Sequence, residues 1–136
     1  MSYEWKHYLN FANGLLKDGT YSDSSTNYRV AISRAYYAAY HIVLAFIEVH
    51  NLPKGRTGAS HERVINAYST MDRKDSNFKS MCKSIGYNLR RLRDRRNKAD
   101  YDGNCNCTES DAKFAVNLAE NIISKIETLG NKYFQN

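Results

Sequence analysis

The segment from about Thr26 to Asn51 constrains the fold more than any other, because its apolar residues recur at helical spacing. One broad face carries Tyr28, Ala31, Ile32, Ala35, Ala39, Ile42, Val43, Phe46 and Val49. Apolar character extends beyond that face at Val30, Tyr40, Leu44 and Ile47. A helix that is apolar over so much of its circumference packs against several neighbours. The segment is therefore predicted to be the central helix of a bundle.

Four more helices are predicted from the same spacing, over about residues 2–17, 61–71, 76–98 and 108–129. Thr108 with Asp111 is typical of a capping box at the start of the last one. The connector 51–59 holds the only proline, Pro53, and is where we expect flexibility. With 136 residues, no internal repeat and no alternating strand pattern, the chain is predicted to be one domain, 1–136. Its predicted fold is an all-α, four-to-five-helix up-and-down bundle.

The positive charge of the chain is concentrated in one predicted helix. Residues 79–98 hold eight Lys and Arg and one acid, Asp94, so this segment carries +7 while the whole chain carries +6. The remainder is therefore close to neutral. Such a local basic surface suits a polyanion, most often nucleic acid or the acidic surface of a partner. The simpler alternative is a solvated helix face with surplus arginine.

Arg96 lies in the middle of the apolar stripe of this basic helix. The stripe is formed by Met81, Cys82, Ile85, Leu89, Leu92 and Ala99. A guanidinium cannot lose its charge, so its place on a packing face requires a partner or a purpose. The structural alternative is neutralisation by Asp100, its i+4 neighbour. The functional alternative is a phosphate group, which arginine binds with two parallel hydrogen bonds.

Several classes of protein and ligand receive no support from the sequence. No run approaches the ~20 apolar residues needed to cross a bilayer, so no membrane partner is expected. Three cysteines, an odd number, favour a reducing, cytoplasmic location. Cys105 and Cys107 lie in a predicted turn without the further ligands that zinc needs. The sequence also lacks a glycine-rich phosphate loop of the kind that binds nucleotide cofactors. Neither a metal nor a cofactor is therefore expected.

Two motifs are distinctive in combination. Ser33 to His41 (SRAYYAAYH) lies on the predicted central helix, and Arg95 to Tyr101 (RRNKADY) lies at the end of the basic helix. Between them is Ser60 to Ile65 (SHERVI). Together, in this order, the three segments resemble the HEPN-domain family of small bacterial and archaeal proteins. The resemblance extends from about Tyr28 to Ile126.

The resemblance implies a helical bundle that dimerises. Many family members are metal-independent endoribonucleases, which act as toxins paired with a nucleotidyltransferase antitoxin or as antiphage-defence effectors. Their motif is an Arg, a polar residue and, a few residues later, a His, and two copies meet across the dimer. Arg96 and Asn97 match the first pair, whereas Tyr101 stands where active members have His. An unperturbed imidazole titrates near pH 6.5 and a phenol near 10, so Tyr101, Asp100 and His41 are all candidate proton carriers.

The tyrosine favours an alternative function, a non-catalytic module that holds RNA, a nucleotide or a nucleotidyltransferase partner. Tyr101 would then bind phosphate or be the target of nucleotidyl transfer by that partner. His61 stays open between a surface residue near a helix start and a member of the site. The tyrosines of the central helix are expected to pack or to bridge protomers, with base stacking as the alternative. The candidate RNA-binding residues are Arg34, Arg90, Arg91, Arg93, Arg95 and Lys98.

Overall fold

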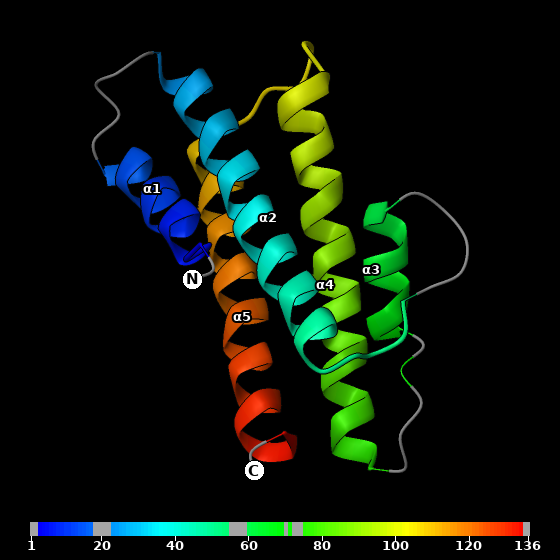
Figure 1. Cartoon of the computed structure of the whole chain (residues 1–136). Helices are drawn as coiled ribbons and strands as arrows, with labels where there is room; N and C mark the ends of the chain where they lie inside the picture. Colours follow the sequence, from blue (N-terminus) through cyan, green and yellow to red (C-terminus); the bar gives the residue numbers. More distant parts are fainter. Residues whose placement is uncertain (1–2, 18–22, 55–59, 70, 72–74, 135–136) are drawn as a thin grey trace.

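The computed structural model describes residues 3–17, 23–54, 60–69, 71 and 75–134, and this part of the chain contains five helices. Four of them alternate in direction and form a bundle: α1 (Lys6–Lys17), α2 (Ser24–Val49), α4 (Ser76–Tyr101) and α5 (Glu109–Tyr133) (Figure 1). The short α3 (Ser60–Ser69) packs mainly against α4. The predicted all-α bundle is confirmed.

α2 is the central helix, as the breadth of its apolar surface predicted. It packs against α1, α4 and α5. Its alanines at positions 31, 35, 38 and 39 are completely buried, so the neighbouring helices can approach its backbone closely. By length and composition alone α2 is apolar enough to cross a membrane. In this bundle it is instead the core helix, with most of its apolar side chains buried.

Side-chain caps fix where three of the helices begin. Asp23 caps α2 by accepting a hydrogen bond from the backbone N of Thr26 at 2.9 Å, and Asp75 caps α4 in the same way. Thr108 and Asp111 form the predicted capping box, in which each side chain accepts from the other residue's backbone N. Each cap pairs amide groups that the helix itself leaves free.

Some helix ends differ from the prediction for identifiable reasons. α1 begins at Lys6 rather than near residue 2, and Trp5, just before it, stacks on His41 of α2. α2 ends at Val49, before Asn51 adopts a left-handed φ of 51°, a conformation that asparagine tolerates. α5 continues past Leu129 to Tyr133, whose ring packs on Phe78. Residues 55–59 of the connector predicted to be flexible lie outside the described residues.

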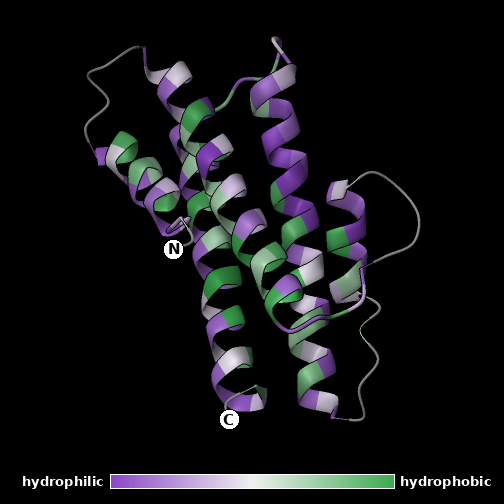
Figure 2. Ribbon diagram, viewed as in Figure 1, coloured by the Kyte–Doolittle hydropathy of each residue, from purple (hydrophilic) through white to green (hydrophobic). Residues whose placement is uncertain are grey.

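α3 and α4 approach each other most closely at Gly86. A Cβ atom at this position would lie 2.6 Å from Oγ of Ser69 and 3.2 Å from the carbonyl oxygen of Ile65. The absence of a side chain at Gly86 therefore lets α3 lie directly on α4. This contact places α3 beside the second half of α4, which holds most of its Arg and Lys residues. Figure 2 shows that half as a largely hydrophilic stretch.

Candidate functional site

Arg96 lies on the buried side of α4, as its place in the apolar stripe predicted, and is only 5% exposed. Its guanidinium carbon lies 4.9 and 5.3 Å from the ring centroids of Tyr36 and Tyr37 on α2. The ring of Tyr101, at the end of α4, is 5.6 Å away. One guanidinium nitrogen donates a long hydrogen bond of 3.4 Å to the Tyr101 hydroxyl. Three tyrosine rings thus surround the cation.

No carboxylate in the described part of the chain forms an ion pair with Arg96. Asp100, the neighbour that could have neutralised it, is exposed and accepts a hydrogen bond of 3.1 Å from the hydroxyl of Ser33. Nε of Arg96 is buried and has no hydrogen-bond partner. The structural alternative from the sequence, a pair between Arg96 and Asp100, is therefore wrong.

The surroundings of Arg96 only partly offset the cost of burying its charge. Removing an ion from water costs several kcal/mol. A cation–π contact returns about 0.5–2 kcal/mol, and the guanidinium cannot escape the cost by losing a proton. A buried cation with an unused donor is suited to an anion that arrives from outside, and the planar guanidinium fits a phosphate in particular.

His61, at the start of α3, is linked to this cation through Tyr36, which contacts both. Its Nδ1 shares a hydrogen bond with the hydroxyl of Tyr36, and its ring stacks on Tyr40 with centroids 4.2 Å apart. Burial, followed by the positive charges of Arg96 and Arg93, lowers the pKa of His61 below its usual value. His61 is therefore neutral at pH 7.

The bond between Tyr36 and His61 leaves both neutral forms of the imidazole accessible. Burial raises the pKa of the Tyr36 phenol, so this hydroxyl keeps its proton at neutral pH. A phenol can donate or accept a hydrogen bond, so the ring can carry its own proton on either nitrogen. Nε2 of His61 can thus offer either a lone pair or a proton, which is what acid–base chemistry requires of one group.

The other two candidates from the motif and the central helix occupy different surroundings. Asn97 is half-buried and makes no side-chain hydrogen bond within the described residues. His41 stacks on Trp5 with centroids 3.7 Å apart and nearly parallel rings. Burial lowers the pKa of His41. His41 lies close enough to His61 to lower the pKa of that residue in turn.

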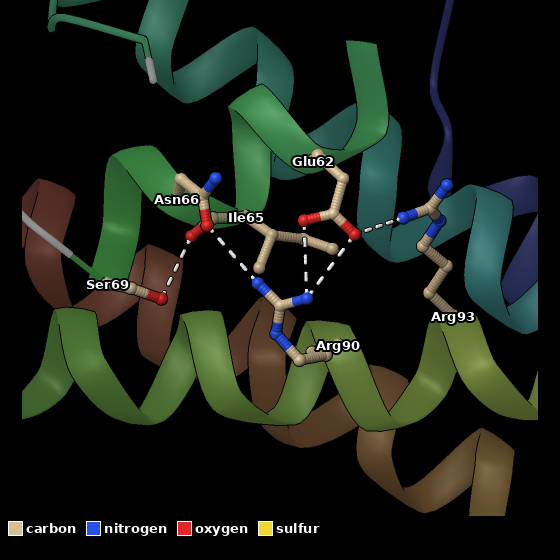
Figure 3. Close-up of polar contacts among 6 residues, drawn as sticks. All are labelled: Glu62, Ile65, Asn66, Ser69, Arg90 and Arg93. Carbon is tan, nitrogen blue, oxygen red and sulfur yellow. Dashed lines mark hydrogen bonds and ion pairs between the residues drawn. The ribbon is translucent and has the colours of Figure 1, made fainter. Parts of the chain in front are cut away.

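Glu62 of α3 neutralises two of the arginines that were expected to bind RNA. Its carboxylate lies 2.5 Å from Arg93 and 3.2 Å from Arg90 (Figure 3). Arg90 also donates to Asn66 one turn further along α3. Nε of Arg93 is buried without a partner, but a terminal nitrogen of Arg93 is paired with a carboxylate, which Arg96 lacks among the described residues. These two arginines hold α3 on α4.

Arg91 and Arg95 face the opposite way, toward α5. Both guanidinium groups lie over the ring of Phe114, 5.0 and 4.6 Å from its centroid. Arg95 also pairs with Asp111 at 3.1 Å, and Arg91 lies 5.3 Å from the ring centroid of Tyr87. Because successive residues of a helix point about 100° apart, the predicted single basic surface is divided among α2, α3 and α5.

Of the remaining candidate RNA-binding residues, Lys98 is exposed and Arg34 is half-buried on α2. The guanidinium of Arg34 lies 5.3 Å from the ring centroid of Tyr8 on α1. Neither side chain has an ion pair or a hydrogen bond within the described residues. Arg34, Tyr37 and His41 are all half-buried and follow one another at helical spacing along α2.

Arg29 holds the segment that carries the motif. Its guanidinium donates to the carbonyl oxygen of Ala99 at 2.8 Å and to that of Asp102 at 3.0 Å. It also contacts the carbonyls of Lys98 and Cys105. The last carbonyls of a helix lack partners within the helix and carry partial negative charge, so this cation satisfies them. The end of α4 is thereby fixed to α2.

The two loop cysteines contact each other beside this segment. Sγ of Cys105 and Sγ of Cys107 are 3.6 Å apart. Burial, together with the hydrogen bond to Cys105, raises the pKa of Cys107 to about 11, so this thiol is protonated at neutral pH. Within the described residues no cluster of three His, Cys, Asp or Glu side chains is placed to hold a metal ion.

The sequence pattern located Arg96 but not the residues that complete its surroundings. Tyr36 was expected to pack or to bridge protomers, with base stacking as the alternative, yet it lies against both Arg96 and His61. The one signal for His61 was its place in the third motif segment. No motif pointed to Arg29, because its partners are backbone carbonyls.

Comparison with known proteins identifies one family. The sequence model of the HEPN domain matches residues 5–129, which is nearly the whole chain. Neither a curated protein nor a solved structure matches the chain. The matched range contains α1 through most of α5, including every residue placed in the site above.

Proposed function

The chain belongs to the HEPN-domain family, and from this premise we propose that it acts on RNA as a homodimer. Its activity is endonucleolytic cleavage of RNA without a metal ion. The protein would function as a toxin or as an antiphage-defence effector. The two copies of Arg96 would form a composite phosphate site across the dimer. A nucleotidyltransferase antitoxin is the partner that such a toxin would require.

One observation carries this proposal, the unpaired charge of Arg96. The guanidinium is 5% exposed, has no acidic partner among the described residues and retains an unused Nε donor. A purely structural arginine would be expected to have a carboxylate or several carbonyls as partners, as Arg93 and Arg29 do. A phosphodiester of RNA provides the missing negative charge and two acceptor oxygens.

The groups around that cation suit the chemistry of RNA cleavage. In metal-independent cleavage the ribose 2′-hydroxyl attacks the adjacent phosphorus, and the 5′-oxygen leaves with a proton. Arg96 would stabilise the charge of the pentavalent phosphate, and Asn97 would orient it. Neutral His61 would take the proton of the 2′-hydroxyl at Nε2 while Tyr36 holds its other nitrogen, and the imidazolium so formed would give that proton to the departing 5′-oxygen. Tyr101, whose hydroxyl already contacts Arg96, would hydrogen-bond a phosphate oxygen.

Tyr101 also supports a second candidate function, a non-catalytic module that binds RNA, a nucleotide or the antitoxin. Its side chain is 75% exposed, and it matches the position at which active family members carry histidine. An exposed phenol can hold a phosphate but is a poor base at neutral pH. In this function Arg96 would keep its phosphate and no bond would break.

Cleavage of RNA in EDTA by site variants separates the two functions. Wild-type protein is incubated with mixed single-stranded RNA, alongside Arg96→Met, His61→Gln and the control Lys83→Met. The control removes an exposed cation of the same helix that lies more than three turns before Arg96 and outside the candidate site. Nuclease function predicts that Arg96→Met and His61→Gln each lose at least about tenfold in rate, since one proton-transfer group typically contributes roughly 10²–10⁴-fold.

Two outcomes of the same experiment contradict the nuclease. If wild-type protein binds the RNA in a salt-sensitive manner and leaves it intact, the module is the correct function. If it does neither, the nuclease and the RNA-binding form of the module both fail. Light scattering of the same samples gives the mass of the particle, and a monomer of 15.7 kDa would exclude the composite site.

A further inference from the structure

An aromatic pocket lies between α1 and α2, apart from the immediate surroundings of Arg96. It is lined by Tyr3, His7, Tyr8, Phe11, Val30 and Arg34. Its volume is about 560 Å³. Sites for small ligands occupy roughly 300–1,000 Å³, so this pocket is large enough for a flat ring system of the size of a nucleobase.

We propose that this pocket binds a nucleobase of single-stranded RNA, on the same strand as the phosphate held at Arg96. The inference rests on the proposed function, because it assigns a further part of the same substrate. It adds a second site on α1 and α2 that takes the flat ring of a base rather than the charge of a phosphate.

The lining of the pocket has the chemistry of a stacking site. Four of its six side chains are rings, and those of Tyr3 and Phe11 are each 54% exposed. Exposed aromatic rings of this kind bind successive bases of a single strand, because every base has a π-face. The exposed rings of Tyr3 and Phe11 offer such a base an apolar surface on which to stack.

Arg34 gives the pocket its charge. The guanidinium lies 5.3 Å from the ring centroid of Tyr8 and pairs with no carboxylate among the described residues. The lining contains this one permanent cation and no acid. A nucleotide complements both features, since its base stacks and its phosphate is negative. A second copy of this chain would have to bring its own acid to Arg34.

A row of rings joins the pocket to Arg96. Arg96 lies over Tyr37, whose ring centroid is 6.2 Å from that of His41. His41 stacks on Trp5 at 3.7 Å, and Trp5 lies 5.2 Å from Tyr8 in the pocket. The phosphate site and the base site are therefore linked by adjoining side chains across α4, α2 and α1. In this proposal one single strand lies across both.

Trp5 provides the test, because it is the only tryptophan in the chain and lies in this row. Its fluorescence is titrated with uridine and adenosine monophosphates, with ribose 5-phosphate, and with a short single-stranded RNA. The base-containing ligands are expected to change the emission to saturation, whereas ribose 5-phosphate, which has no base, leaves it unchanged at the same concentration.

Variants then locate the site. Phe11→Ser is the first choice because an exposed ring is not needed for folding, and Arg34→Gln removes the cation. Each is expected to weaken the binding of RNA by about tenfold, the effect of losing one stacked base or one charged contact. Tyr87→Leu is the matched control: its ring is 63% exposed and also lies 5.3 Å from an arginine, but on the α5 side.

Two results would overturn the inference alone. In the first, Phe11→Ser and Arg34→Gln bind RNA as tightly as wild-type protein while Arg96→Met does not; the phosphate site then stands and the base pocket fails. In the second, the pocket variants convert a dimer to a monomer with unchanged nucleotide affinity, which makes the pocket an interface between copies. If wild-type protein binds no RNA or nucleotide at all, the proposed function fails and this inference with it.

Discussion

Replacing Arg96 by methionine is expected to stabilise the fold while it removes the proposed function. Methionine keeps an unbranched apolar stem of similar length, so the space against Tyr36 and Tyr37 stays filled. The substitution leaves no buried group without a partner, because Tyr36 keeps its bond to His61 and Tyr101 is exposed to water. Arg96 is therefore a residue whose loss the core tolerates.

The expected change in the free energy of unfolding is the burial cost that the substitution removes minus the stabilisation from the contacts that it removes. Three cation–π contacts of about 1 kcal/mol each and one long hydrogen bond disappear. The cost of burying an unpaired guanidinium, several kcal/mol, disappears as well. The expected net gain is about 1–2 kcal/mol, and each kcal/mol raises Tm by roughly 3–5 °C in a chain of this size.

Urea unfolding followed by circular dichroism measures this gain, with Arg93→Met as the opposite control. Arg93 is paired with Glu62 at 2.5 Å, so its loss is expected to lower stability by about 0.5–1 kcal/mol after allowance for its partial exposure. If Arg96→Met lowers stability by more than about 1 kcal/mol, the cation is a structural element of the core. This result would refute the interpretation that the buried charge is reserved for an incoming anion.

Three other predictions concern the fold. Gly14→Ala, at an exposed position of α1, is expected to raise the free energy of unfolding by about 0.5–1 kcal/mol. Gly86→Ala should be at least about 1 kcal/mol less stable than Gly14→Ala, because its Cβ meets Ser69. Equal shifts in Tm for the two variants would contradict the close contact between α3 and α4. Thr108→Ala removes the capping box and is expected to cost about 1 kcal/mol in urea unfolding, and an unchanged midpoint would mean that α5 does not depend on it. Because the pKa of His61 is lowered in the folded state, stability should be full above about pH 6.5 and fall as the pH drops below it, since the unfolded chain takes up the proton first. His61→Gln should flatten this decline as the pH falls below about 6.5, and an identical decline in the variant would assign it to other groups.

The helices of this protein were predictable because their signals are local. The apolar spacing of α2 and the Thr108–Asp111 capping box each lie within a few turns of one helix, and the structure contains both. The ends of α1 and α5 were not predictable, since they depend on rings that meet across the fold, such as Trp5 on His41. A helix end that is set by a distant contact leaves no local pattern.

The site was predictable only in its centre. The helical period alone predicts that Arg96 lies on an apolar face, and Arg96 is indeed buried. That period does not tell whether Arg96 pairs with Asp100 or stays without an acidic partner. Ser33 of α2 decides it, because its hydroxyl engages the carboxylate of Asp100 across the two helices. The meeting of Tyr36 with His61 likewise depends on how α3 is laid against α4.

Arg29 makes no contact with the groups proposed to act on RNA, yet it fixes the segment that carries one of them, Tyr101. One side chain satisfies carbonyls from the final turn of α4 and from the loop after it, including those of Ala99 and Asp102. Without it, the residues that display Tyr101 would unravel from their helical end while the hydrophobic interior stayed intact. A genetic screen for inactive but soluble protein would therefore recover substitutions at Arg29 as readily as substitutions at the cation itself.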